Sequence, residues 1–347
     1  MPLPFQPSCL PLLLGSLPHR SAIQALEASG RYAGTLLAWP QLPQRSFREQ
    51  SLVQSAVGFP GLVVDGAHAQ VYVDREAGMR DLGRLGLAYL EDDIAYAALS
   101  PDDAAGIAEL IRQRDSLRGV LVAKGQLLGP ISMAAQLVDE HQRPLLYDEV
   151  LFEAVAHHLY LRAAWQDRYL RDFFGASIVC LDEPFLDAVG MPFLPLDWDV
   201  VRGQIDTVLA GIRGCRGLYA SGAVDWTQVL KTSVELIIAD VHGHGQALVD
   251  AAPALAAFLE RGGTVGLGLV PADEEGLALA EVNALVWRAH TLLRALEERG
   301  VPTDRLVRQA VISTSGGLGQ LSIPAAERAM QLVAEVSAQL REQHGLA

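Results

Sequence analysis

Short, nearly continuous apolar runs alternate with longer segments of helical periodicity over almost the whole chain. Runs that are apolar at successive positions are typical of parallel strands buried on both faces. The alternation predicts a parallel sheet wrapped by helices, and eight such strands close a (β/α)8 (TIM) barrel of the α/β class. We predict these strands at Pro11–Leu17, Gly34–Trp39, Gly119–Gln126, Ser177–Glu183, Gly217–Ser221, Glu235–Asp240, Thr264–Val270 and Ala310–Ser315.

Three of the intervening helices have clear signals. Asp148–Phe174 carries apolar residues at helical spacing, and Glu281–Arg299 does so until it meets Gly300. A glycine after the last apolar residue, followed closely by Pro302, is a typical helix stop. We predict a last helix over Pro324–Arg341.

The segment Gln41–Arg118 breaks the regular alternation. It contains GLVVDGAHAQVYVD, two alternating runs around Gly66, Ala67 and His68, which predict a β-hairpin. About 75 residues between the second and third strands far exceed an ordinary connection. We predict that this insertion belongs to a single domain, residues 1–347, and covers the barrel mouth as a lid.

The composition and net charge of the chain limit the kinds of binding partner that we expect. Half of the 347 residues are apolar and the formal net charge is −14. An acidic chain lacks the basic surface that nucleic acid and anionic membranes require, so we expect neither as a partner. A small-molecule ligand is expected instead, and the oligomeric state is not indicated.

The compartment is expected to be the cytoplasm. Three widely spaced cysteines, Cys9, Cys180 and Cys215, do not form a disulfide framework. The first residues, MPLPFQPSCLPLLLG, lack a basic start and contain several prolines, which makes a poor signal peptide. No apolar stretch reaches the ~18 residues of a membrane span.

Candidate chemistry lies at the carboxyl ends of the predicted strands, where such barrels hold their sites. Asp182 and Glu183 end the apolar run SIVCL, and adjacent strand residues point to opposite faces. Only one carboxylate is therefore expected to face the barrel axis, where it can contact a ligand. The alternative is that one carboxylate caps the next loop while the other pairs with an arginine. The candidate ligand-contacting residues are Ser16, His19, Trp39, Gln126, Asp182, Glu183, Tyr219, Ser221, Asp225 and Asp240.

Other residues leave alternatives open. Lys124 is either a Schiff-base lysine or, as is commoner, an ion-pair partner. His242 and His244 have metal-like spacing beside Asp240, although a glycine-rich loop with solvated histidines has the same pattern. Cys180 lies within a predicted strand and is expected to be a core residue.

Taken together, the motifs resemble the cobalamin-independent methionine synthase superfamily, which includes uroporphyrinogen decarboxylase. The resemblance covers nearly the whole chain and is strongest to the short, single-barrel branch. It rests on the order and spacing of LLLGSLPHR (12–20), AWPQLPQRSFRE (38–49), GLVVD (61–65), KGQLLGPIS (124–132), CLDEP (180–184), SGAVDW (221–226), GLGLVP (266–271) and STSGGLG (313–319).

The resemblance implies a pocket for methyl transfer from a folate or other carrier to a zinc-bound thiol. Its zinc ligands are a His and a Cys after strand five, a Glu after strand six and a Cys after strand eight. These positions fall on Tyr219, Ser221, the neighbourhood of Asp240, and Gly316. Because no His or Cys lies within two residues of Tyr219, Ser221 or Gly316, we expect the zinc site to be lost and no cofactor to be bound.

Three functions remain open at this stage. The first is a methyltransferase-type barrel, resembling 5-methyltetrahydropteroyltriglutamate–homocysteine S-methyltransferase, with a pocket for a small amino-acid or methyl-carrier ligand. The second is a zinc-free, decarboxylase-like enzyme, whose polyacidic substrate would call on Arg20, Arg45 and Arg48. The third is a non-catalytic accessory protein that binds a folate-, corrinoid- or amino-acid-like ligand.

Overall fold

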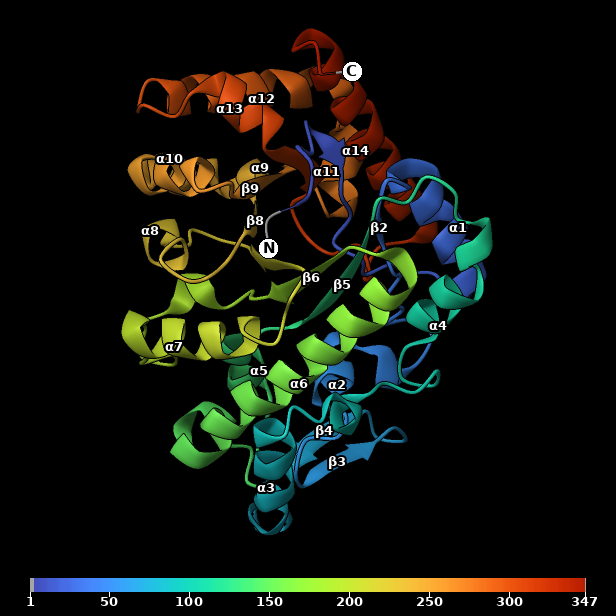
Figure 1. Cartoon of the computed structure of the whole chain (residues 1–347), viewed down its shortest axis with the longest axis vertical. Coiled ribbons are helices and arrows are strands. Elements are labelled where there is room, and N and C mark those ends of the chain that lie inside the picture. Colours follow the sequence, from blue (N-terminus) through green and yellow to red (C-terminus); the bar gives the residue numbers. More distant parts are fainter. Residues whose placement is uncertain (1–2, 347) are drawn as a thin grey trace.

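The computed structural model describes residues 3–346 and contains one eight-stranded parallel sheet, ordered β1-β10-β9-β8-β7-β6-β5-β2. Helices surround this sheet on its outside (Figure 1). The structure therefore confirms the predicted (β/α)8 barrel. Its strands are β1 (Leu10–Pro11), β2 (Leu36–Ala38), β5 (Val122–Leu128), β6 (Ser177–Asp182), β7 (Cys215–Ala220), β8 (Leu236–Ala239), β9 (Thr264–Val270) and β10 (Ala310–Thr314).

The predicted first strand, Pro11–Leu17, was wrong in its extent. Only Leu10 and Pro11 pair with β10, and Leu12 adds one further backbone bond to Ile312. Beyond Leu12 the backbone turns away at Gly15, whose φ of 114° lies in the region that favours glycine. The apolar residues after Pro11 are buried by the turn rather than by a ladder. By contrast, β9 has the bounds that the sequence predicted.

The barrel closes at its mouth. No ladder joins β1 to β2 among the described residues; an isolated bridge between Ser16 and Gln41 connects the two edges instead. The Leu17 amide donates to the Gln41 carbonyl at 2.9 Å, and the Gln41 amide donates to the Gly15 carbonyl at 2.9 Å. Closure thus depends on residues that follow the strands.

The outer layer confirms the three predicted helices within two residues at each end. None of the helices in the described range 3–346 combines the length and apolar composition that a membrane span needs. The helices outside the insertion are α1 (Ala22–Ala33), α5 (Pro130–Gln136), α6 (Glu149–Phe174), α7 (Trp198–Leu209), α8 (Trp226–Val229), α9 (Val241–Asp250), α10 (Ala252–Glu260), α11 (Glu274–Leu279), α12 (Val282–Glu297), α13 (Thr303–Arg308) and α14 (Ile323–Gln343).

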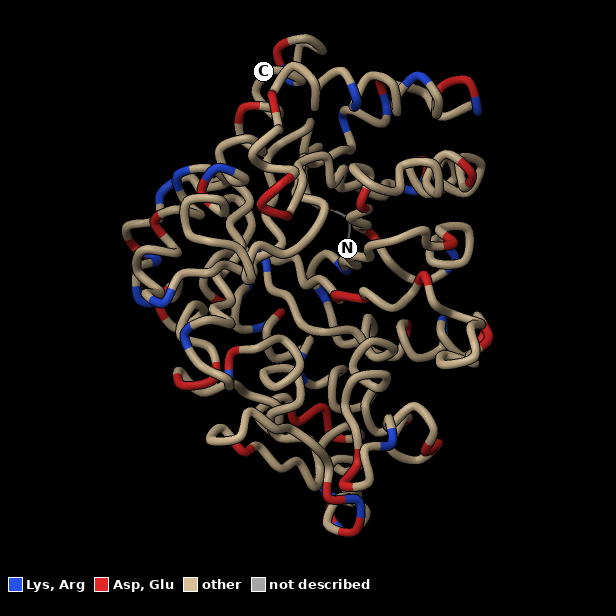
Figure 2. The backbone as a smooth tube through the Cα atoms, turned by 180° about the vertical axis from the view of Figure 1, so that it is seen from behind, with Lys and Arg blue, Asp and Glu red and all other residues tan. Residues whose placement is uncertain are grey.

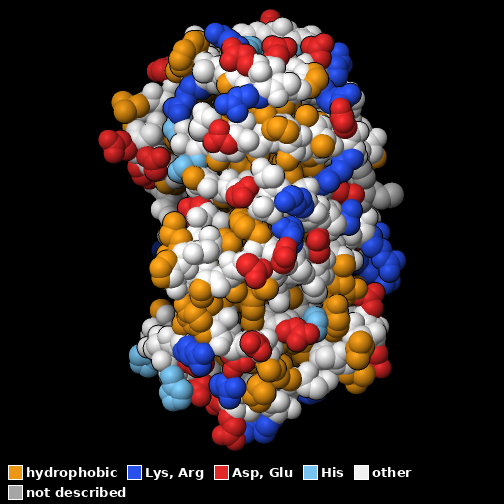
Figure 3. Space-filling view, turned by 90° about the vertical axis from the view of Figure 1, so that its left-hand side faces the viewer, with side chains coloured by type: hydrophobic (Ala, Val, Ile, Leu, Met, Phe, Trp, Pro, Cys, Tyr) orange, Lys and Arg blue, Asp and Glu red, His pale blue; other side chains and the backbone are white. Residues whose placement is uncertain are grey.

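Charged residues are spread over the molecule. Acidic and basic positions are scattered over the backbone seen from behind (Figure 2), and both signs are interspersed with apolar side chains on the flank in Figure 3. The excess of acid is therefore distributed, in keeping with a net charge of −14.

The insertion contains the predicted hairpin, formed by antiparallel strands β3 (Leu62–Asp65) and β4 (Gln70–Val73). It also contains three helices that the sequence pattern did not indicate: α2 (Ser51–Ala56), α3 (Arg75–Leu90) and α4 (Ala105–Arg112). Helix α3 packs on α6 and α4 packs on α1, both in the outer layer, whereas α2 packs on strand β5. The role of the insertion as a lid stays a prediction.

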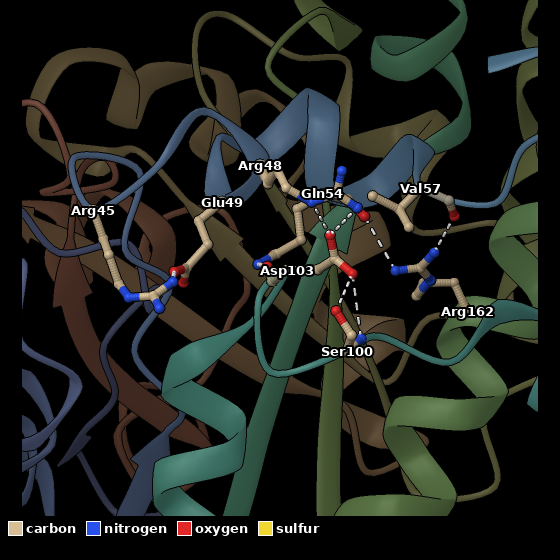
Figure 4. A network of polar contacts seen from close by, with 8 residues as sticks. All are labelled: Arg45, Arg48, Glu49, Gln54, Val57, Ser100, Asp103 and Arg162. Atoms are coloured by element: carbon tan, nitrogen blue, oxygen red, sulfur yellow. Dashed lines mark hydrogen bonds and ion pairs between the residues drawn. The ribbon is translucent and has the colours of Figure 1, made fainter. Parts of the chain in front are cut away.

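Helix α2 is anchored to the barrel by two side chains of α6. Arg162 is only 1% exposed, and its guanidinium donates to the Gln54 carbonyl at 3.1 Å and to the Val57 carbonyl (Figure 4). His158 donates from Nε2 to the Ser55 carbonyl at 2.9 Å. The last carbonyls of a helix lack partners within the helix, so α6 supplies them here.

The side chain of Gln54 links α2 to the mouth and to the rest of the insertion. Its Oε1 accepts a bond from Gln41 at 2.7 Å, and its Nε2 donates to the Asp103 carbonyl at 2.7 Å. The Asp103 carboxylate in turn accepts from Arg48 at 2.6 Å and from the Ser100 hydroxyl at 2.5 Å (Figure 4). A continuous polar network thus connects the barrel rim to the insertion.

Replacing the buried arginine tests this anchor. We expect Arg162→Met to lower the free energy of unfolding by about 3 kcal/mol, because two carbonyls lose charged donors while buried. Urea unfolding followed by circular dichroism measures the change. In Arg168→Met, the side chain removed is 69% exposed, so this control should stay within about 0.5 kcal/mol of wild type. Equal effects of the two substitutions would contradict the anchoring role.

The neighbouring histidine predicts a pH dependence of stability. Burial, together with the nearby Arg162, lowers the pKa of His158 to about 3 from its ordinary 6.5. The folded state therefore holds His158 neutral, and its contribution to stability is full above pH 6.5 and is lost as the pH falls toward 3.

Between pH 7 and pH 5, wild type should lose about 2 kcal/mol more unfolding free energy than His158→Gln, which does not titrate. Urea titrations at the two pH values provide the comparison. The matched control is His141→Gln, whose side chain is 80% exposed and which should keep the wild-type dependence. Identical losses in wild type and His158→Gln would refute the assignment.

Candidate functional site

A small cavity lies where the strands of the barrel end. Its volume is about 30 Å³, enough for a water molecule but far below an ordinary ligand pocket. It is nevertheless lined by several polar groups from different strands, as expected of a barrel site. The lining residues are Leu14, Ser16, Gln41, Lys124, Gln126, Cys180, Asp182, Tyr219 and Gly317.

Lys124 and Asp182 are the opposite charges of this cavity. The Lys124 side chain is fully buried, and its Nζ donates to the Leu14 carbonyl at 2.7 Å. Burial lowers the pKa of Lys124 and raises that of Asp182 to about 6, while the charge of each partner opposes the other's shift. Each of the two groups can receive an oppositely charged group of a ligand.

The side-chain amide of Gln126 forms part of the cavity wall and is held there by hydrogen bonds. Its Nε2 donates to the Trp39 carbonyl at 3.0 Å, and its Oε1 lies 3.4 Å from the Lys124 Nζ. A Cβ at Gly15 would lie only 2.5 Å from the Gln126 side chain. The glycine of the GSLP turn is therefore required both by its φ and by the close approach of Gln126.

Tyr219 occupies the space between the ends of β7 and β10. Its hydroxyl donates to the Ser315 carbonyl at 2.7 Å, and a Cβ at Gly316 would lie 3.7 Å from that hydroxyl. Two of the positions matched to zinc ligands thus lie close together, but they are occupied by Tyr219 and Gly316. Burial, and then the charge of Asp182, raises the pKa of Tyr219, so the hydroxyl stays protonated.

These residues do not fit a zinc ion. Zinc in proteins takes thiolate, imidazole and carboxylate ligands, and Tyr219, Ser221 and Gly316 supply none of them. Within residues 3–346 no group of three or more His, Cys, Asp or Glu side chains converges.

The weaker metal candidates do not converge either. The Asp240 carboxylate accepts from the Gly243 amide at 2.9 Å and pairs with His244 Nδ1 at 2.9 Å. His242 turns its Nδ1 to the Leu269 carbonyl at 3.0 Å instead. Asp240 thus caps helix α9, and the two histidines have different partners.

Glu183 lies outside the cavity lining. Its carboxylate accepts from the amides of Ile131 and Ser132 at 2.9 and 2.8 Å and from the Ser132 hydroxyl at 2.6 Å. Burial raises its pKa to about 7, against these three bonds. Of the two adjacent carboxylates, Asp182 faces the cavity and Glu183 caps helix α5, which is the division that strand geometry predicts.

Four predicted contact residues, Ser16, Gln126, Asp182 and Tyr219, line the cavity together. His19 is buried beside α14, with Nε2 3.6 Å from Glu327, and Trp39 is buried with its indole bonded to Gln166 at 3.1 Å. Ser221, Asp225 and Asp240 also lie outside the lining.

The predicted contact set omitted five lining residues: Leu14, Gln41, Lys124, Cys180 and Gly317. The period of two was the signal for Lys124 and Cys180, because residues two positions before Gln126 and Asp182 share their face of the strand. Lys124 makes hydrogen bonds within the barrel, and Cys180 is buried as predicted.

The comparisons with known proteins show the fold. No family model and no curated protein matches this chain. A solved methyltransferase from Methanosarcina mazei is similar with a TM-score of 0.53 and 14% identity, over 92% of this chain and 83% of that one.

Two further solved structures match less closely. A B12-independent methionine synthase from a Shewanella species, in complex with selenomethionine, has a TM-score of 0.49 and 14% identity over 69% of this chain and 68% of that one. A putative vitamin-B12 independent methionine synthase from Listeria monocytogenes has a TM-score of 0.43 and 14% identity over 68% of each chain. At 14% identity, the similarity to the Methanosarcina methyltransferase shows that the two chains share a barrel fold.

Proposed function

We propose that the barrel mouth binds a small zwitterionic, amino-acid-like ligand, in a methyl-transfer-type pocket that works without zinc. The observation that carries the proposal is the convergence of Ser16, Lys124, Gln126 and Asp182 on one cavity at the carboxyl ends of the strands. The buried Lys124 and the partly buried Asp182 line the same cavity, and their charges complement the two charges of an amino acid.

Each charge has a natural partner. The ligand ammonium pairs with the Asp182 carboxylate, which accepts no hydrogen bond from a described protein group. The ligand carboxylate pairs with Lys124, whose Nζ now donates to the neutral Leu14 carbonyl and lies near Gln126. Ser16 lines the same cavity and adds a hydroxyl group to its donors.

The thiol-activating step of the resembling family does not transfer with the pocket. A free thiol of pKa ~8.5 is only about 3% thiolate at pH 7, and no residue at the matched positions lowers that pKa as zinc would. We therefore propose ligand binding without zinc-dependent methyl transfer to a thiol.

The decarboxylase-like alternative has less support at the mouth. A polyacidic substrate needs free arginines, whereas Arg45 pairs with Glu49 at 2.5 Å and Arg48 pairs with Asp103 at 2.6 Å. Glu49 is fully buried, so its charge belongs to that pair.

Binding of L-methionine and L-homocysteine, measured by isothermal titration calorimetry, tests the proposal. We expect Asp182→Asn to weaken binding at least tenfold, because the ammonium loses its charged acceptor. Asp225→Asn, at an exposed residue outside the cavity, should bind as wild type. Absence of binding to both amino acids by wild type would reject the proposed function.

The raised pKa of Asp182 also predicts how the ligand affinity depends on pH. Because the pKa of Asp182 is raised to about 6, protonation below that pH removes the negative charge. Wild-type affinity should therefore fall about tenfold between pH 7 and pH 5. An affinity independent of pH over this range would show that Asp182 does not hold the ammonium.

Zinc content provides an independent prediction. After dialysis with zinc and then against metal-free buffer, the protein should retain far less than one zinc per chain by mass spectrometry, because the matched positions offer no thiolate or imidazole. Incubation with homocysteine and methyltetrahydrofolate should yield no methionine above the zinc-free background. Stoichiometric zinc, or zinc-dependent methionine formation, would contradict this reading.

A further inference from the structure

The loop between β10 and α14, residues Ser315–Leu321, forms one wall of the cavity through Gly317 and is its roof. Gly317 lines the cavity on its inner side and is exposed on its outer side. The loop also contains Gly316 and Gly319, so three of its seven residues have no side chain. Glycines permit backbone rearrangements that other residues resist.

Hydrogen bonds and the buried side chains of Leu318 and Leu321 hold this roof down. At its start, the Ser315 amide donates to the Val270 carbonyl at 2.7 Å. The Leu318 amide donates to the Ser16 carbonyl at 3.1 Å, and the Tyr219 hydroxyl donates to the Ser315 carbonyl at 2.7 Å. From the insertion, the Gln44 amide donates to the carbonyls of Gly319 and Leu321 at 3.0 and 3.3 Å.

The packing below Gly319 is tight. A Cβ at Gly319 would clash with the Ser16 hydroxyl and would lie 2.6 Å from the Pro43 Cγ. The loop therefore lies directly on the bridge that closes the barrel, and it can do so only because residue 319 is glycine.

We propose that the segment Ser315–Leu321 is a gate, latched by Gln44, that must lift before any ligand larger than water enters the barrel. The cavity of about 30 Å³ is too small for an amino acid, and Gly317 of the roof is the exposed residue of its lining. The outer end of the gate is fixed, because the Ser322 amide donates to Glu274 at 2.8 Å and Ser322 caps α14. The proposed movement is therefore confined to the glycine-containing loop.

This inference is independent of the ligand, because the barrel contains its own reporter. Cys180 lines the cavity and is 2% exposed, so a thiol reagent modifies it only after entering the cavity. Cys9 and Cys215 are also buried, but neither lines the cavity. Cys9 directly precedes β1 and its thiol donates to the Val307 carbonyl, and Cys215 is the first residue of β7, at the end of the barrel opposite the mouth. Their rates report unfolding rather than gating.

The experiment measures modification of each cysteine by methyl methanethiosulfonate, resolved by peptide mass spectrometry. Loss of the latch in Gln44→Ala should raise the rate at Cys180 about fivefold, as expected for one net hydrogen bond. Gly319→Ala should raise it at least as much, because the added methyl group pushes the loop from Ser16 and Pro43.

Matched controls are available for both substitutions. Gln331→Ala removes a surface amide that bonds only within α14, and Gly30→Ala adds a methyl group where no atom lies within 4 Å. Both should leave the rate at Cys180 unchanged. In all variants Cys9 and Cys215 should keep their wild-type rates.

A reversible lock provides the opposite test. A Cβ built at Gly317 lies 3.4 Å from the Ser16 Cβ, close to the separation in a disulfide. In Ser16→Cys with Gly317→Cys, oxidation should slow modification of Cys180 at least tenfold relative to the reduced form of the same protein.

Two results would overturn the gate. One is an unchanged Cys180 rate in Gln44→Ala, Gly319→Ala and the oxidised double variant, which would mean that the reagent enters by another route. The other is a parallel rise at all three cysteines, which would mean that the barrel unfolds as a whole.

Discussion

The closure of the barrel by loop residues rather than by a ladder is the constraint on which the rest of this structure depends. Strands β1 and β2 are short and do not pair, so the Gly15–Leu17 turn and Gln41 complete the ring. The unpaired backbone groups at this seam would otherwise be buried without partners. The seam lies at the mouth, so the residues that close the barrel also line its cavity.

The insertion and the loop after β10 are both hydrogen-bonded to this seam. Gln41 bonds to Gln54 of α2, and α2 is held in turn by the buried Arg162 of α6. On the other side, the Ser16 carbonyl accepts from the loop after β10. The insertion, the seam and that loop are therefore one connected polar structure around the mouth, although they come from distant parts of the chain.

Inside this ring, burial determines the electrostatics. Desolvation pushes both Lys124 and Asp182 toward their neutral forms, and their proximity keeps the charged forms accessible. Tyr219 adds a hydrogen bond where the resembling family has metal ligands. The interior is consequently polar, and no set of metal ligands converges among residues 3–346. This combination is suited to the binding of a small charged molecule that we propose.

Part of the candidate site follows from alternation along single strands. Because side chains alternate along a strand, the segment KGQ puts Lys124 on the same face as Gln126. In the same way, the segment CLD puts Cys180 on the same face as Asp182. The same rule assigns Glu183 to the opposite face, where it caps α5. Trp39 and Asp225 show the limit of the approach: being near a strand end does not determine which way a side chain points.

Local periodicity and residue identity are sufficient to predict the barrel, most strand bounds, the hairpin and the absence of zinc ligands at the matched positions. How the ring closes, where α2 lies and how little space the mouth leaves can be seen only in the folded chain. Those features arise from contacts between segments far apart in the chain, such as Gln44 with Gly319 and Gln54 with Arg162. No local pattern encodes such pairings, since each side chain has many possible partners until the fold brings one within reach.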